Sequence, residues 1–353
     1  MLWLFDTLGE APSIALLGLL VGVLFGAAAQ RSRFCLRAAT IELAEGSFGP
    51  KIAVWLLVFT AALALVQSFL ALGWLELDDA RQFAQPGSIS GAVIGGVMFG
   101  IGMILARGCA SRLLVLSATG NLRALISGLV LTLIAQASLT GVLAPARVWL
   151  FSLWTVPPGA GRNLGEMLSL STTGLAIGGC LALFATAFWA YRYAGKSLPV
   201  ILWSVLVGSA VALGWLLTYQ ASRIAFEPVS VSSITFTGPA TDTLMGLVNR
   251  PDLPLSFGVG LVPGVFVGSF LAALLSGEFA IQRFQPDTPM ERYLIGGVLM
   301  GFGAMLAGGC AVGAGVTGGS ALSSTAWLAL LCMWVSAMAT HRLLNHGHAA
   351  VVA

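Results

Sequence analysis

The chain has 353 residues, of which 58% are hydrophobic and only 9% are charged, and its formal net charge is +3. A water-soluble domain carries about 25% charged residues. This composition therefore excludes a water-soluble protein and indicates an all-α integral membrane protein with the lipid bilayer as its solvent. The chain has no basic run with interleaved aromatic residues, which argues against a nucleic-acid partner.

The predicted membrane spans begin directly after a short N-terminal stretch. That stretch carries Asp6 and Glu10 and lacks a basic start, which argues against a cleavable signal peptide. Crossing the hydrocarbon layer takes about 20 mostly apolar residues. Nine stretches meet this criterion, at about 11–29, 51–74, 88–106, 121–143, 168–190, 198–218, 255–276, 292–307 and 323–343.

Four segments between the spans are too long for turns and too short to cross the membrane: 31–47, 108–119, 222–248 and 309–320. They are rich in Gly, Ser, Thr and Pro. Irregular backbone at membrane depth is tolerated only where protein or a water-filled cavity satisfies its amides. We therefore expect four re-entrant segments that face a common interior.

Two blocks of the sequence are nearly the same. Residues 95–110, GGVMFGIGMILARGCA, align without gaps to residues 296–311, GGVLMGFGAMLAGGCA. A weaker similarity links 20–39 with 206–225, so five crossings separate equivalent helices. The sequence therefore predicts two inverted repeats, residues 1–150 and 198–353, which are joined by a linking helix and hinge at 151–197.

The distribution of Lys and Arg predicts the orientation of the chain. With the N-terminus outside, most basic residues fall in the cytoplasmic loops, as the positive-inside rule requires. We therefore expect an external N-terminus and a cytoplasmic C-terminus.

Glycine precedes cysteine at the end of two spans, as Gly108–Cys109 and Gly309–Cys310. Glycine there can end one helix and allow a short second helix to begin. The free N–H groups of such a helix attract anions, and a thiol is a weak donor with a polarizable sulfur. Cys35 lies in another re-entrant segment. The pattern predicts a path for a soft, sulfur-bearing anion.

The remaining cysteines, Cys180 and Cys332, lie within spans and are expected only to pack. No CxxC spacing occurs, so no metal site and no other cofactor is expected. Arg37 and Arg107 are candidates for attracting anions, although basic residues there also serve as topology determinants. Glu42 and Glu45 are candidate partners for the arginines of the first re-entrant segment.

Together, the blocks RSRFCLRAA, GGVMFGIGMILARGCA, SITFTGP and GGVLMGFGAMLAGGCA resemble the YeeE/YedE family of sulfur-compound transporters, over essentially the whole chain. The resemblance implies an hourglass-like bundle in the bacterial inner membrane and thiosulfate uptake past three cysteines, which fall on Cys35, Cys109 and Cys310. Thr237 and Gly238 belong to the matching FTGP block. A small TusA-like cytoplasmic sulfur carrier is the implied partner.

This sequence departs from the family pattern in two places. Arg107 stands where the second block has Gly308, and the first loop lacks a CxMGA pattern. The substrate therefore stays open among thiosulfate, a related sulfur anion and a selenium compound. The alternatives to a transporter are a membrane sulfurtransferase that forms a cysteine persulfide, with Arg107 lowering the thiol pKa, and a protein whose cysteines only pack.

Overall fold

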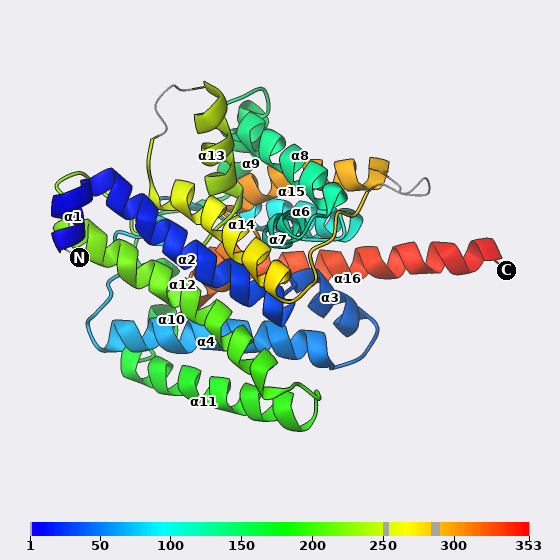
Figure 1. Ribbon diagram of the computed structural model, residues 1–353, viewed down its shortest axis with the longest axis horizontal. Helices are drawn as coiled ribbons and strands as arrows, with labels where there is room; N and C mark the ends of the chain where they lie inside the picture. The colour runs from blue at the N-terminus through cyan, green and yellow to red at the C-terminus, as the bar shows by residue number, and fades with distance from the viewer. Residues whose placement is uncertain (1, 250–253, 284–289, 353) are drawn as a thin grey trace.

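The computed structural model describes residues 2–249, 254–283 and 290–352. The described part is almost entirely helical (Figure 1). It contains nine helices that are long and apolar enough to cross a membrane. The predicted all-α membrane fold is confirmed. Positions 250–253, 284–289 and 353 of the predicted second repeat lie outside the described residues.

The first half of the chain forms ten helices and strands before the connecting region. They are α1 (Leu2–Leu8), α2 (Glu10–Ser32), α3 (Leu36–Ala44), α4 (Pro50–Ala71), α5 (Arg81–Ala84), β1 (Gly87–Ser88), α6 (Ile89–Leu105), α7 (Ala110–Ala118), α8 (Leu122–Leu139) and α9 (Ala144–Ser152). The connecting region holds β2 (Thr155–Val156), η1 (Ala160–Arg162), α10 (Leu164–Met167) and α11 (Thr172–Arg192).

The second half of the chain begins with a helix of 27 residues. Its elements are α12 (Leu198–Ile224), α13 (Thr237–Asn249), α14 (Phe257–Leu275), α15 (Met290–Ala307), η2 (Ala311–Gly318) and α16 (Ser324–Val352). The segment expected at 222–248 is therefore the end of α12, an extended stretch and the short helix α13. The element η2 is π-helical rather than α-helical.

Helices α6 and α15 cross at glycines that allow their backbones to touch. A Cβ atom added to Gly95 would lie 2.5 Å from the carbonyl oxygen of Gly303, and one added to Gly102 would lie 2.6 Å from that of Gly296. The residue numbers run in opposite directions, so the two helices are antiparallel. Small residues permit this close approach between membrane helices.

Helices α2 and α14 pack by the same means but run in the same direction. A Cβ added to Gly22 would lie 2.4 Å from the carbonyl oxygen of Leu261, and one added to Gly264 would lie 2.3 Å from that of Leu19. Helix α12 meets α4 in a similar way, because a Cβ on Gly208 would lie 2.5 Å from the carbonyl oxygen of Val58. The bundle is thus held by glycine contacts on several helix pairs.

Most helix contacts of the bundle occur in matching pairs. Helix α2 packs on α14 as α12 packs on α4, and α6 packs on α16 as α15 packs on α8. The short elements repeat this arrangement: α7 lies against α8 and η2 against α16, while α13 lies against α8 and α3 against α16. Helix α11 stands apart, since its main contact is with α4 on the edge of the bundle (Figure 1).

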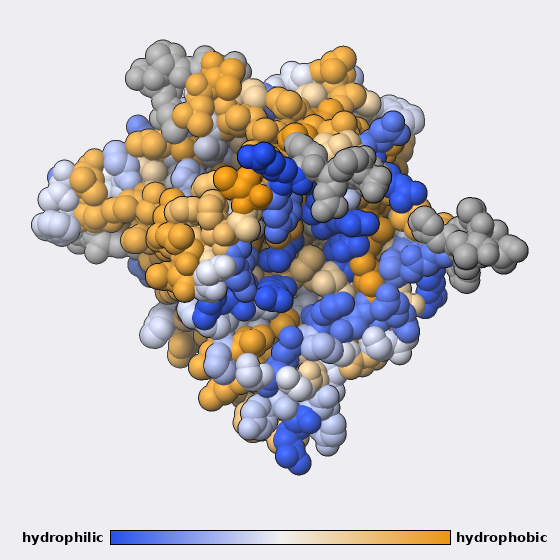
Figure 2. Space-filling view, turned by 45° about the vertical axis from the view of Figure 1, so that its right-hand side comes forward, coloured by the Kyte–Doolittle hydropathy of each residue, from blue (hydrophilic) through white to orange (hydrophobic). Residues whose placement is uncertain are grey.

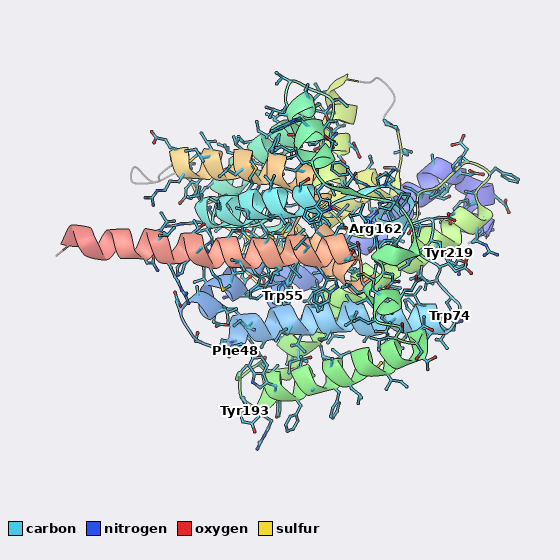
Figure 3. The ribbon with its side chains drawn as sticks, turned by 180° about the vertical axis from the view of Figure 1, so that it is seen from behind. Phe48, Trp55, Trp74, Arg162, Tyr193 and Tyr219 are labelled. Carbon is cyan, nitrogen blue, oxygen red and sulfur yellow. The ribbon has the colours of Figure 1, made fainter. Side chains whose placement is uncertain are left out.

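The end of the bundle visible in Figure 2 is polar, and aromatic side chains lie near both ends (Figure 3). Hydrophilic side chains gather on the end face in Figure 2, and hydrophobic ones cover the flanks. Trp74 and Tyr219 lie near one end, and Phe48 and Tyr193 lie near the other (Figure 3). Tryptophan and tyrosine are enriched where membrane proteins meet the headgroup region. This distribution fits a bundle that crosses the bilayer along its helix axes.

Candidate functional site

Cys35, Cys109 and Cys310 share one local backbone arrangement. Each is the residue immediately before a short helix, α3, α7 and η2 respectively. Two positions before each cysteine the backbone is left-handed, with φ 55° at Arg33, φ 56° at Arg107 and φ 80° at Gly308. The left-handed residue ends the preceding spanning helix and turns the chain so that a second helix begins at the cysteine.

The helix breaks therefore lie one residue earlier than expected from Gly108 and Gly309. The left-handed region favours glycine, yet Arg107 occupies it in the first block. Gly309 has a different role, because a Cβ there would lie 2.8 Å from the backbone nitrogen of Ala314. At Gly108 the nearest atom would be the flexible Cδ2 of Leu113, at 3.3 Å. Only Gly309 is required by close backbone packing.

The three thiols gather in the interior of the bundle. Cys109 is 2% exposed and Cys310 is fully buried, whereas Cys35 is partly exposed. Cys109 lies within electrostatic range of both Cys35 and Cys310. No disulfide joins any of them. The structure therefore brings together three free thiols that are far apart in the sequence.

The local contacts of the thiols differ. The Sγ of Cys109 lies 3.3 Å from the hydroxyl of Ser111, and the Sγ of Cys310 accepts a hydrogen bond of 3.5 Å from the backbone N–H of Gly313. Cys180 is exposed on the flank of α11, and Cys332 is partly buried in α16. Neither lies at the start of a short helix, so the structure separates them from the other three.

The extended stretch before α13 lies directly on η2. Thr317 donates a hydrogen bond of 2.6 Å to the carbonyl oxygen of Ile234. A Cβ added to Gly313 would meet the hydroxyl of Thr235. The SITFTGP block is therefore placed beside the helix that begins at Cys310.

Two residues of this block have groups available to a ligand. Thr237 is fully buried, and its hydroxyl finds no hydrogen-bond partner among the described residues. A buried polar group without a partner is uncommon in native structures. Nothing lies within 4 Å of a Cβ built on Gly238. The start of α13 thus combines an unpaired hydroxyl with open space at the next residue.

Arginine side chains surround an aromatic ring at one mouth of the bundle. The guanidinium carbon of Arg123 lies 4.7 Å from the ring centre of Tyr293, and that of Arg107 lies 6.0 Å from it. Arg37 is in electrostatic contact with Arg107, Arg123 and Tyr293, and its buried Nε has no partner among the described atoms. In the described part of the chain, no carboxylate lies within ion-pair distance of these arginines.

The acidic residues of this region have other partners than we expected. Glu42 does not pair with an arginine but accepts hydrogen bonds of 2.9 and 2.7 Å from the backbone N–H groups of Lys51 and Ile52 at the start of α4. Glu45 lies 3.3 Å from His341. The negative charge of Glu42 stabilises a helix N-terminus, and the arginine cluster keeps its positive charge.

The chemical character of the site favours a soft anion. Short helix N-termini carry a partial positive charge, and guanidiniums without a carboxylate partner attract anions. The element η2, AVGAGVTG, places no bulky side chain over its backbone, and π-helical turns occur frequently at functional sites. The thiols add polarizable donors rather than a catalytic base.

Sequence reasoning missed two contributors to this arrangement. Arg123 and Tyr293 complete the arginine cluster. Arg123 lies at the start of α8. In the sequence it is only one of the basic residues from which the orientation of the chain was predicted. A single aromatic residue such as Tyr293 carries no spacing signal, because only packing places it between two arginines.

A polytopic helical bundle with short helix N-termini inside it and arginines without carboxylate partners at one mouth is the architecture of a membrane transporter. The chain belongs to the sulphur-transport family, the YeeE/YedE proteins, whose family model matches residues 31–339. The predicted resemblance is confirmed. The protein is thus a multi-pass membrane transporter of sulfur compounds.

Two curated relatives match nearly the whole chain. One is the thiosulfate transporter TsuA of Spirochaeta thermophila, which is 30% identical over 332 residues that cover 88% of this chain and 93% of the relative. The other is the thiosulfate transporter TsuA of Escherichia coli K12, which is 28% identical over 351 residues that cover 91% of this chain and 92% of the relative.

Proposed function

We propose that this transporter carries thiosulfate, or a closely related sulfur anion, into the cytoplasm across the inner membrane of a bacterium. The observation that carries the proposal is the shared helix start at Cys35, Cys109 and Cys310. Three thiols at the positive ends of three short helices form a route that suits a dianion with a terminal sulfur. The names of the two relatives support thiosulfate as the substrate.

In this proposal the thiols pass the anion along by hydrogen bonds. The arginines near Tyr293 hold a positive potential at the cytoplasmic mouth, and Thr237 with Gly238 offers a further donor beside η2. In the proposed orientation the segment 309–320 re-enters the membrane from outside and the segment 108–119 from inside. Cys310 therefore meets the anion before Cys109. Cys109 is only 2% exposed, and burial disfavours a charged thiolate, which supports a neutral donor thiol over a persulfide-forming nucleophile.

The paired helix contacts support two inverted repeats, residues 1–150 and 198–353, joined by 151–197. The antiparallel crossing of α6 and α15 places Gly95 on Gly303 and Gly102 on Gly296, which are equivalent contacts of the two aligned blocks. An axis in the membrane plane relates such helices.

The proposed orientation places the N-terminus outside and the C-terminus in the cytoplasm. The arginine cluster then faces a TusA-like sulfur carrier on the cytoplasmic side. A cytoplasmic reporter fused to the C-terminus should be active in cells, and an inactive fusion of an expressed protein contradicts the orientation.

The decisive test is uptake of labelled thiosulfate by purified protein in liposomes, with sulfate and selenite as competitors. Cys109→Ala and Cys310→Ala should abolish uptake, because each removes a thiol from the route. Cys180→Ala is the matched control, since that thiol lies on the flank of the bundle. Unchanged uptake in both interior variants contradicts the relay.

The same experiment separates the alternatives. A persulfide adduct on a cysteine after exposure to thiosulfate, found by mass spectrometry, favours the sulfurtransferase. Uptake of labelled selenite by the same liposomes, without uptake of labelled thiosulfate, favours a selenium compound as the substrate.

A further inference from the structure

A groove opens on the flank of the bundle between α7, α8, α13 and α14. Its cavity volume is about 200 Å³. Leu129 on α8 and Leu247 on α13 line it and are 42% and 69% exposed, so the groove reaches the outer surface of the bundle. Ala110 and Phe236 also line it, and they are the sequence neighbours of Cys109 and Thr237.

The walls of the groove offer no free hydrogen-bonding group from its three hydroxyl side chains. Ser117 donates to the carbonyl oxygen of Leu114 at 2.7 Å, Thr132 to that of Gly128 at 2.9 Å, and Thr243 to that of Pro239 at 2.7 Å. Each hydroxyl is thus satisfied within its own helix, and the other lining side chains are apolar. The groove suits hydrocarbon and not water or an anion.

The matching region of the other half is filled by the protein itself. Because Gly22 meets Leu261 as Gly208 meets Val58, position 262 on α14 corresponds to position 59 on α4. Val262 lines the open groove, whereas Phe59 is 7% exposed. The ring of Phe59 stands at 5.3 Å from that of Trp327 in a T-shaped contact.

Further rings complete this filling. Trp55 stacks on Phe59 at 5.2 Å and meets Trp334 edge-on at 5.1 Å. One half of the bundle therefore closes its flank with four aromatic rings, and the other half leaves a groove at the equivalent place.

We propose that an acyl chain of a bilayer phospholipid occupies this groove and takes the place of the rings. Helices α8 and α14, which form two of its walls, are membrane spans, so lipid tails are the medium that contacts the opening. The groove ends at Ala110 and Phe236, directly behind the start of α7 and α13. A bound chain seals the interior site from the bilayer, a consequence that rests on the proposed function.

Photolabelling tests the occupant directly. The full-length protein is reconstituted with a phosphatidylcholine that carries a diazirine midway along one acyl chain, irradiated without thiosulfate, and mapped by mass spectrometry. Adducts should concentrate in peptides of α8 and α13 that line the groove. Gly128→Leu fills the groove, because the nearest atom to its Cβ is that of Leu113 at 3.9 Å, and should lower this labelling several-fold.

Gly178→Leu is the matched control. Gly178 also lies within a spanning helix, and nothing is within 4 Å of its added Cβ. Its labelling pattern should equal that of the wild type. Val262→Phe introduces the ring that the other half has, and should lower groove labelling even if Gly128→Leu does not fold.

Two results would overturn the proposal. The first is groove labelling that neither folded variant reduces, which would show contact with bulk lipid only. The second is labelling that is absent from α8 and α13 while cross-linking joins two copies there, which would make a second protein chain the occupant. Because the readout needs no substrate, loss of thiosulfate uptake leaves this test unaffected.

Discussion

The clearest prediction compares the same substitution at the two equivalent glycines before the buried cysteines. Gly309→Ala places a Cβ 2.8 Å from the backbone nitrogen of Ala314 and 3.1 Å from the backbone carbon of Gly313. Both atoms belong to η2, so the helix itself has to shift. Gly108→Ala meets only side-chain atoms, the closest at 3.3 Å on Leu113, which a small rotamer adjustment relieves.

The expected energies differ accordingly. Overpacking against fixed atoms costs about 1–3 kcal/mol, and we assign this range to Gly309→Ala. At Gly108 the lower conformational entropy that alanine gives the unfolded chain offsets most of the contact cost, so the change should stay below about 1 kcal/mol. Because η2 begins at Cys310, its displacement also moves one thiol of the proposed route.

Thermal unfolding in detergent and thiosulfate uptake in liposomes measure the two effects. Gly309→Ala should lower both the unfolding temperature and uptake, and Gly108→Ala should leave both near the wild-type values. Equal losses at the two positions would refute the reasoning, since they would show that the glycine–cysteine pairs act alike whatever their packing.

Three further predictions follow from individual contacts. Arg107→Gly relieves a side chain held on left-handed backbone and should stabilise the fold by about 1 kcal/mol, measured by thermal unfolding. It should also lower uptake at low salt, measured in liposomes, because it removes a guanidinium from beside the ring of Tyr293. Cys332→Ala should leave uptake unchanged in the same liposomes, because Cys332 does not begin a short helix. Arg162→Met should lower the unfolding temperature. Burial lowers the pKa of Arg162 and opposes its charge, but its guanidinium donates hydrogen bonds to the Gln85 carbonyl and to the Thr325 hydroxyl. Hydrogen bonds from a charged group contribute about 1.5–3 kcal/mol each. An unchanged melting curve would show that water replaces these bonds.

Part of the candidate site was predictable because short, local sequence patterns mark its residues. The repeated glycine–cysteine blocks identified Cys109 and Cys310, and the short segment after the first span identified Cys35. The position of the helix break was not predictable, because Arg107 carries the left-handed backbone that glycine would normally occupy. The pairing of Glu42 with the start of α4 was not predictable either. Whether its carboxylate binds a helix N-terminus or an arginine depends on which of the two the folded chain places next to it.

The sequence alone determined the membrane fold, because the shortage of charge and the length of the apolar stretches leave no other solvent for the surface. It also determined the family, because the paired blocks are specific in residue and spacing. Only the tertiary structure decided which groups meet. Helix packing brings three distant thiols into one interior and gathers Arg37, Arg107 and Arg123 around Tyr293. It also fills one flank of the bundle with aromatic rings and leaves a groove on the other. Contacts between distant segments depend on how the helices cross, and the crossing of helices produces no repeating pattern in the sequence.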